Sequence, residues 1–201
     1  HGTYLLGADH DGDHKSNTAW VLVQREPRNK TVPNFDADRD DLPGLTVRGH
    51  QNGGKDGPPD GGKNGHQDGD HVARFALHVD RATTVKGDMT AVLHLRVISD
   101  DRDSEPLEAT VQVEVLRCGA DRDNCKTVAS ARFLALTAEQ GSWPELDEQS
   151  FQPYKIPFGP ASVELGAGER LELRVTVLSR EGWDVVIAFD AASTPSGLYV
   201  G

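Results

Sequence analysis

The chain has 201 residues and a mass of 21.8 kDa, which is the size of one large domain or two small ones. Its 32 Asp and Glu residues outnumber 21 Lys and Arg, and the formal net charge of −11 repels nucleic acids and anionic membranes. No apolar run approaches the roughly 20 residues of a membrane-spanning helix. We therefore exclude a nucleic-acid-binding protein and a membrane span, and we predict a single domain over residues 1–201.

The chain starts with His1 and Gly2 rather than with methionine. This start fits the cleavage of a signal peptide or the end of an expression tag. An amino-terminal His-Gly on a β domain also resembles the lytic polysaccharide monooxygenases, and that resemblance implies copper held by the terminal amine and imidazoles, His1 among them. The apolar residues Tyr4, Leu5 and Leu6 follow, and an extended segment of this kind can complete the sheet of a neighbouring subunit. They are the candidate assembly strand.

Two runs of alternating carboxylates come next along the chain. The first consists of Asp9, Asp11 and Asp13, and the second of Asp36, Asp38 and Asp40. Calcium binds about six to eight oxygens, and alternating Asp residues in a loop present several of them from one short segment. The first run is not an EF-hand loop, because Trp20 stands where that loop closes with Glu. We predict calcium as the cofactor; the alternative is that both runs are turn formers in water.

Residues 49–70 read GHQNGGKDGPPDGGKNGHQDGD and contain almost no apolar side chain. A segment of this composition cannot bury enough surface to pack a core. We therefore expect a long Gly- and Asp-rich loop within the domain.

Strand patterns dominate the rest of the sequence. Apolar residues occupy every second position over 89–97, 111–115 and 171–177, which predicts strands with one buried face. Further strands are predicted at Thr18–Gln24, Val72–Val79, Thr127–Leu136, Ser162–Leu165, Asp184–Phe189 and Leu198–Val200. The uninterrupted apolar run Val185–Phe189 predicts a strand that is covered on both faces.

The two cysteines, Cys118 and Cys125, flank a turn-forming sequence between two of these strands. We predict a disulfide at a hairpin end; the alternative is a pair of free thiols. A metal site is disfavoured because no His lies at ligand spacing. Disulfides persist in oxidising compartments, so the pair favours a secreted, extracellular protein.

Together these patterns predict an all-β fold: an antiparallel, jelly-roll-like β-sandwich of about ten strands with long acidic Gly-rich loops. The carboxyl-terminal sequence resembles the closing strands of surface β-sandwich (jelly-roll) domains of secreted bacterial and archaeal proteins. The matching positions are Gly168, Leu171, Leu173, Phe189, Asp190, Pro195, Ser196 and Leu198, and Tyr4–Gly7 is similar to the opening strand of those domains. The resemblance implies export and an accessory or surface role, and it brings no catalytic residue.

Three functions follow from these observations. The first is a non-enzymatic secreted structural protein, a calcium-stabilised subunit of an extracellular filament, tubule or surface assembly, joined to neighbouring copies by strand complementation. The alternative is an accessory glycan-binding module of a secreted hydrolase, with Trp143 in a Ser-Trp-Pro turn as its contact. Trp20 and Trp183 lie within or beside apolar strands and are expected in the core. The minor alternative is a copper monooxygenase with its metal at His1.

Overall fold

The computed structural model describes residues 2–10, 18–33, 44–49, 71–99, 108–121, 124–136, 151–178 and 183–201. These residues form strands and no helix, which confirms the all-β prediction. In chain order the strands are β1 (Gly2–His10), β2 (Thr18–Val23), β3 (Leu45–Val47), β4 (Val72–His78), β5 (Thr83–Ser99), β6 (Glu108–Cys118), β7 (Lys126–Leu136), β8 (Gln152–Leu165), β9 (Arg170–Val177), β10 (Trp183–Ile187) and β11 (Gly197–Val200). No helix in this part of the chain has the length and apolarity needed to cross a membrane.

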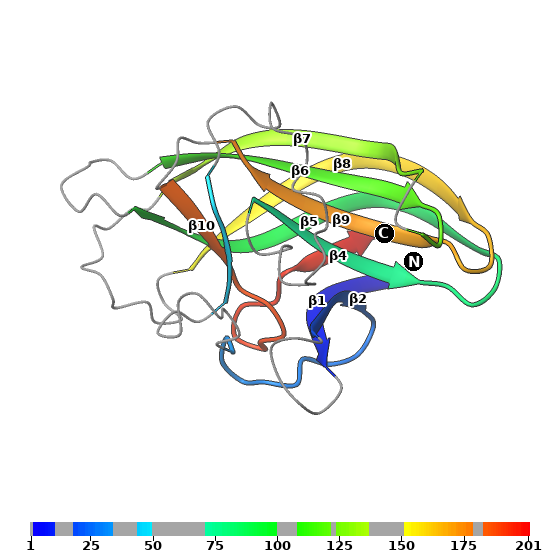
Figure 1. The fold of residues 1–201 in the computed structure, drawn as a ribbon, viewed down its shortest axis with the longest axis horizontal. Helices are drawn as coiled ribbons and strands as arrows, with labels where there is room; N and C mark the ends of the chain where they lie inside the picture. The colour runs from blue at the N-terminus through cyan, green and yellow to red at the C-terminus, as the bar shows by residue number, and fades with distance from the viewer. Residues whose placement is uncertain are drawn as a thin grey trace.

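The strands join in one mostly antiparallel sheet (Figure 1). Its order is β3-β10-β5-β11-β1-β2-β4-β9-β6-β7, and β8 pairs with β5 outside this path. Among the paired strands of the described residues, only β2 and β4 run parallel, with Val21 opposite Ala76. The predicted antiparallel pairing is confirmed, whereas the division into two stacked jelly-roll sheets stays a prediction.

Strand β5 organises one end of this sheet because it is long enough to hold three neighbours. Residues 89–92 pair with β11, residues 95–99 pair with β10, and β8 runs along the opposite edge of β5 from Thr83 to Leu95. The sequence predicted only the second half of β5. Its first half alternates one buried residue, Val85, with exposed Thr84, Lys86 and Asp88, so it carries little hydrophobic signal.

A single large core collects the inward side chains of strands from both ends of the sheet order. The alternating residues predicted over 89–97, 111–115 and 171–177 are all buried in it. Because strands far apart in the order contribute to the same core, the sheet curls around it. Trp20 is half-buried against this core, with its ring 6.1 Å from that of Phe75 and 5.0 Å from that of Phe189, as the sequence predicted.

Strand β10 differs from the others because both of its faces are covered. Val185, Ile187 and Phe189 point into the main core. Val186 and Ala188 point the other way, into a second apolar cluster completed by Val32, Ile98, Phe151 and Ala191. The two clusters confirm the prediction of a strand covered on both faces. β10 is also paired along both edges, with β3 and β5.

The candidate assembly strand lies inside the sheet. Leu5 of β1 is opposite Gly197 of β11 on one side and opposite Val23 of β2 on the other, and Tyr4 and Leu6 are buried. A Cβ on Gly197 would lie 2.6 Å from the Tyr4 carbonyl oxygen, so the close β1–β11 approach requires glycine there. Both edges of β1 are used within its own chain. Strand complementation through Tyr4, Leu5 and Leu6 therefore stays a prediction without support from this arrangement.

Candidate functional site

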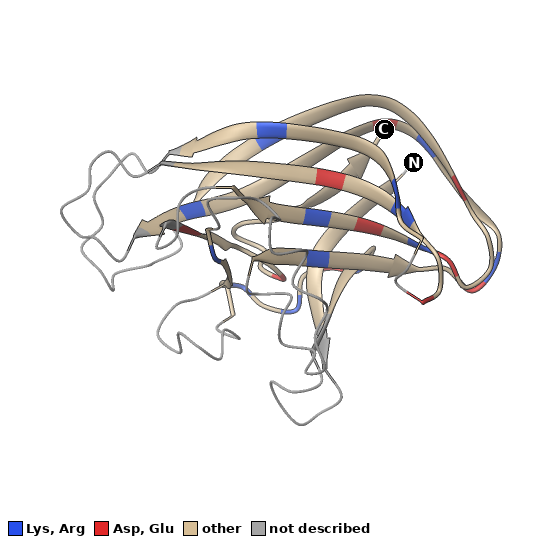
Figure 2. Cartoon of the chain, turned by 45° about the horizontal axis from the view of Figure 1, so that its top comes forward, with Lys and Arg blue, Asp and Glu red and all other residues tan. Residues whose placement is uncertain are grey.

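Polar side chains gather on the outer side of β4, β9, β6 and β7, and we call this surface the charged face. On β9 the core takes Leu171, Leu173 and Val175, so the alternate residues point outward. The strand registers then align these outward residues with their neighbours on β4 and β6. Figure 2 shows acidic and basic residues side by side across this part of the sheet.

Two arginines of the charged face are held by side-chain acceptors close to them. Arg174 on β9 lies opposite Arg74 on β4 and opposite Glu114 on β6. Its guanidinium donates to the Glu172 carboxylate from Nη2 at 2.7 Å and from Nε at 3.1 Å. On the next strand pair, Arg132 Nε donates to Gln112 Oε1 at 2.9 Å. The face is thus a patterned polar surface in which each of these two arginines has a fixed acceptor.

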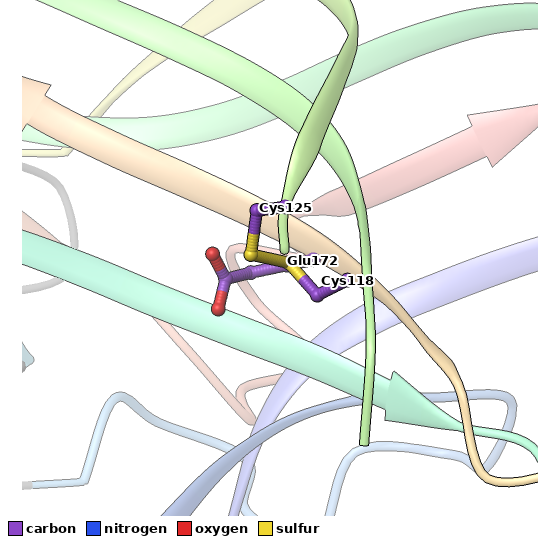
Figure 3. Close-up of side chains that lie close together, drawn as sticks. All are labelled: Cys118, Cys125 and Glu172. Atoms are coloured by element: carbon purple, nitrogen blue, oxygen red, sulfur yellow. A yellow bond between two sulfur atoms is a disulfide. The ribbon is translucent and has the colours of Figure 1, made fainter. Parts of the chain in front are cut away.

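Glu172 is the most deeply placed acid of this face, with 3% of its surface exposed. Figure 3 shows its carboxylate beside the disulfide between Cys118 and Cys125, which the sequence predicted and the structure confirms. One carboxylate oxygen and the two sulfurs lie within 4.8 Å of one another. The chain has no free cysteine, so neither sulfur offers the thiolate that a metal or a thiol nucleophile requires. The disulfide therefore closes the β6–β7 turn, and it lies close to Glu172 of β9.

A second polar cluster lies where the β2–β3 and β10–β11 connections meet. The buried Asp190 has a positive φ of 48° and accepts hydrogen bonds from Arg25 Nη1 at 2.8 Å and from the Arg28 backbone nitrogen at 2.9 Å. Its own backbone nitrogen donates to the Leu6 carbonyl at 2.8 Å. Asp190 thus joins three segments that are distant in sequence, and its role is to hold them together. No sequence signal predicted Arg25 as its partner, because the pair is 165 residues apart.

The Pro195-Ser196 pair before β11 also has a structural role. The Ser196 hydroxyl accepts a hydrogen bond from the His94 backbone nitrogen at 2.9 Å, and the Pro195 carbonyl accepts one from the Tyr199 hydroxyl at 3.4 Å. The imidazole of His94 is half-buried, and this burial lowers its pKa below the ordinary value of 6.5. These contacts fix the start of β11 against β5.

An ion pair at the surface joins the end of β6 to the β8–β9 turn. Arg117 Nε donates to Glu169 Oε2 at 2.6 Å, and Nη2 donates to Oε1 at 2.9 Å. The hydrogen bonds from Arg117 lower the pKa of the Glu169 carboxyl, and the same contacts raise the pKa of Arg117. Because both side chains are open to water, the pair fixes a local geometry and contributes little stability.

Several predicted site residues lie outside the described part of the chain. These are His1, Asp11, Asp13, Asp36, Asp38, Asp40 and Trp143, together with residues 50–70 of the Gly- and Asp-rich loop. Asp9 is in β1 and Trp183 in β10, but the positions of their side chains are not described. Calcium at the two acidic runs, copper at His1 and glycan contact through Trp143 remain predictions.

No protein-family model matches the chain, and no curated protein matches it by sequence. Its fold is similar to part of an aminopeptidase from a marine sediment archaeon (Thaumarchaeota archaeon), at a TM-score of 0.59 and 12% identity, over 98% of this chain and 36% of that one. A CocE/NonD family hydrolase from Staphylococcus aureus aligns at a TM-score of 0.44 and 13% identity, over 65% of this chain and 32% of that one. The chain therefore spans about a third of the length of these hydrolases, and the aminopeptidase shares its fold.

Proposed function

We propose that this chain is an accessory, non-catalytic β module of a secreted hydrolase. The observation that carries this proposal is the match to the archaeal aminopeptidase. Nearly the whole chain, 98%, aligns with only 36% of the larger enzyme, which leaves most of that enzyme outside the shared fold. A fold can serve many functions, so the match supports the module role and does not by itself identify the reaction.

The chemistry of the described residues supports the same role. Both sulfurs are held in the disulfide, which removes a thiol nucleophile. The buried acids Asp190 and Glu172 are paired with Arg25 and Arg174, and Asp190 holds strands and connections together. The disulfide fits an oxidising compartment outside the cell. A filament subunit has no comparable support, because the segment expected to join neighbouring copies is an interior strand.

The test compares the isolated module with the native protein. Recombinant residues 1–201 are assayed on aminopeptidase and ester substrates, and the native protein is purified from its source through an antibody to this chain. We expect no hydrolysis by the recombinant chain and hydrolysis by the native particle, either in one longer polypeptide or in a stable complex. Hydrolysis by the recombinant chain alone, or native filaments without a hydrolase, would overturn the proposal.

The glycan-binding form of this proposal has its own test. Trp143→Ala, at the contact predicted from the sequence, is expected to abolish retention on an insoluble polysaccharide. Lys155→Ala, at an exposed position on β8, should leave retention intact. Equal retention of both variants would remove Trp143 as the contact. The module role would stand, since it rests on the comparison of the native and recombinant proteins.

A further inference from the structure

Two long strands, β7 and β8, end the sheet, and among the described residues each is paired along one edge only. β8 is unsuited to pairing with another strand. It contains Pro153, Pro157 and Pro160, which lack a backbone N–H, and Gly159 has a φ of 84° where the register with β5 shifts. Prolines and bulges of this kind protect a free sheet edge against strand addition.

From Ser130 to Leu136, β7 has none of these protections. Its sequence, KTVASARFLAL, contains no proline, glycine or acidic residue. From Ser130 to Leu136 its pairing with β6 is regular, and the register shifts only near Val128, at the start of the strand. Leu134 lies on the outer side of β7 and is 49% exposed. Among the described residues it is the large hydrophobic residue that is exposed to solvent. A regular, unprotected edge that carries an exposed leucine favours the addition of another strand.

We propose that β7 pairs antiparallel with β7 of a second copy of this chain, around a two-fold axis at Phe133. Such a pairing is isologous: the same strand forms both sides of the interface. Each residue therefore lies opposite the residue that is equally far from Phe133 on its other side, and the two side chains must be compatible. Counting outward from Phe133, Arg132 lies opposite Leu134, Ala131 opposite Ala135, and Ser130 opposite Leu136.

The side chains suit this self-pairing. Arg132 opposite Leu134 lets the aliphatic stem of the arginine cover the exposed leucine, while its guanidinium stays with Gln112. Alanine faces alanine on the core side, where Ala131 and Phe133 already pack against the core. No two like charges lie directly opposite each other, which is the arrangement that destabilises cross-strand pairs. The strand is thus complementary to itself in charge and size.

The charge of the whole protein predicts how salt affects this dimer. Two copies with a formal net charge of −11 each repel one another at long range, and added salt screens this repulsion. Salt should therefore strengthen the dimer. An acidic peptide that binds the basic β7 strand, with its Lys126 and Arg132, would instead bind more weakly in salt. A pairing over seven residues buries less than the roughly 1,200 Å² of standard interfaces, so we expect a weak, reversible dimer.

Sedimentation equilibrium from micromolar to millimolar protein tests the proposal at low and high salt. We expect a concentration-dependent dimer that Leu134→Arg weakens at least about tenfold, because it places two arginines opposite each other. Thr84→Arg, the same charge change at an exposed site on β5, is the matched control and should leave the dimer unchanged. Adding Arg132→Glu to the Leu134→Arg variant should restore it through a crosswise ion pair. Thermal unfolding of each variant checks that the monomer is folded.

Cysteine cross-linking tests the register. In the proposed pairing residues 132 and 134 of the two copies lie directly opposite, within disulfide reach, whereas identical residues lie on a longer diagonal of about 7–8 Å. Mixing the Arg132→Cys and Leu134→Cys variants should therefore give more cross-linked dimer than either variant alone. A chain that stays monomeric at every concentration, a dimer insensitive to Leu134→Arg, or equal cross-linking in all mixtures would overturn the proposal.

Discussion

Strands β10 and β9 lie in the same curled sheet but are built in opposite ways. β10 is apolar at every position from Val185 to Ile187, and each of its faces packs into its own apolar cluster. β9 alternates, with Leu171, Leu173, Val175 and Val177 in the core and charged or polar residues on the charged face. The hydrophobic period thus reports how many faces of a strand are covered, and a polar outer face can still hold a buried acid, Glu172, paired with the partly exposed Arg174.

Alanine substitutions in these two strands should give the largest losses in unfolding free energy. On β10 we expect losses in unfolding free energy on both faces, about 2–5 kcal/mol for Ile187→Ala and about 2 kcal/mol for Val186→Ala. On β9 we expect about 2–5 kcal/mol for Leu173→Ala but less than about 0.5 kcal/mol for the outward Thr176→Ala. Urea unfolding measures all four. A negligible loss in unfolding free energy for Val186→Ala would contradict the burial of the second face of β10.

Removing the disulfide should lower the unfolding free energy by less than the largest of the core alanine substitutions. The double variant Cys118→Ser and Cys125→Ser frees a loop of about eight residues, and loop-closure entropy then gives a loss of about 2–3 kcal/mol. Urea unfolding of the double variant, compared with that of the unreduced parent chain, measures the difference. Equal midpoints would mean that the disulfide contributes nothing to stability.

The ion pair between Glu172 and Arg174 should contribute more to the unfolding free energy than the more exposed acids of the charged face. Glu172→Gln keeps the shape of the side chain but removes the charge that Arg174 contacts, and we expect a loss of about 2 kcal/mol, since Arg174 itself can still reach water. Glu114→Gln is the matched control, because the hydrogen bond that it accepts from Thr127 is long, at 3.5 Å. We expect a loss of under about 0.5 kcal/mol there. Equal losses at the two positions would refute a special role for Glu172.

The smallest expected effect is a pH dependence at His94. Burial lowers its pKa in the folded chain, so between its ordinary value of 6.5 and the lowered value the unfolded chain binds the extra proton. Stability should therefore fall as the pH drops through this window, and His94→Gln should flatten that part of the profile. Unfolding in urea at a series of pH values measures it. Parallel profiles for the two proteins would show that His94 does not titrate differently on folding.

The sequence predicted strands wherever the buried residues form a clear pattern of apolar positions. It found β6, β9 and β10 and the disulfide, because these depend on local patterns. It missed β3, which has three residues, and most of β8, whose three prolines argue against a strand. It could not predict Asp190 with Arg25, or the interior position of β1, because these depend on pairings between residues far apart in sequence. Of the two acidic runs predicted as calcium sites, only Asp9 lies within the described residues, in β1 and without a described side chain, so calcium there stays a prediction.

The most direct test of the proposed accessory role is the assay of the native protein beside recombinant residues 1–201. The proposal predicts that hydrolysis of aminopeptidase or ester substrates elutes with the native particle carrying this chain, and that the recombinant chain is folded, disulfide-bonded and inactive. Native particles without any hydrolase, or hydrolysis by the recombinant chain itself, would contradict it.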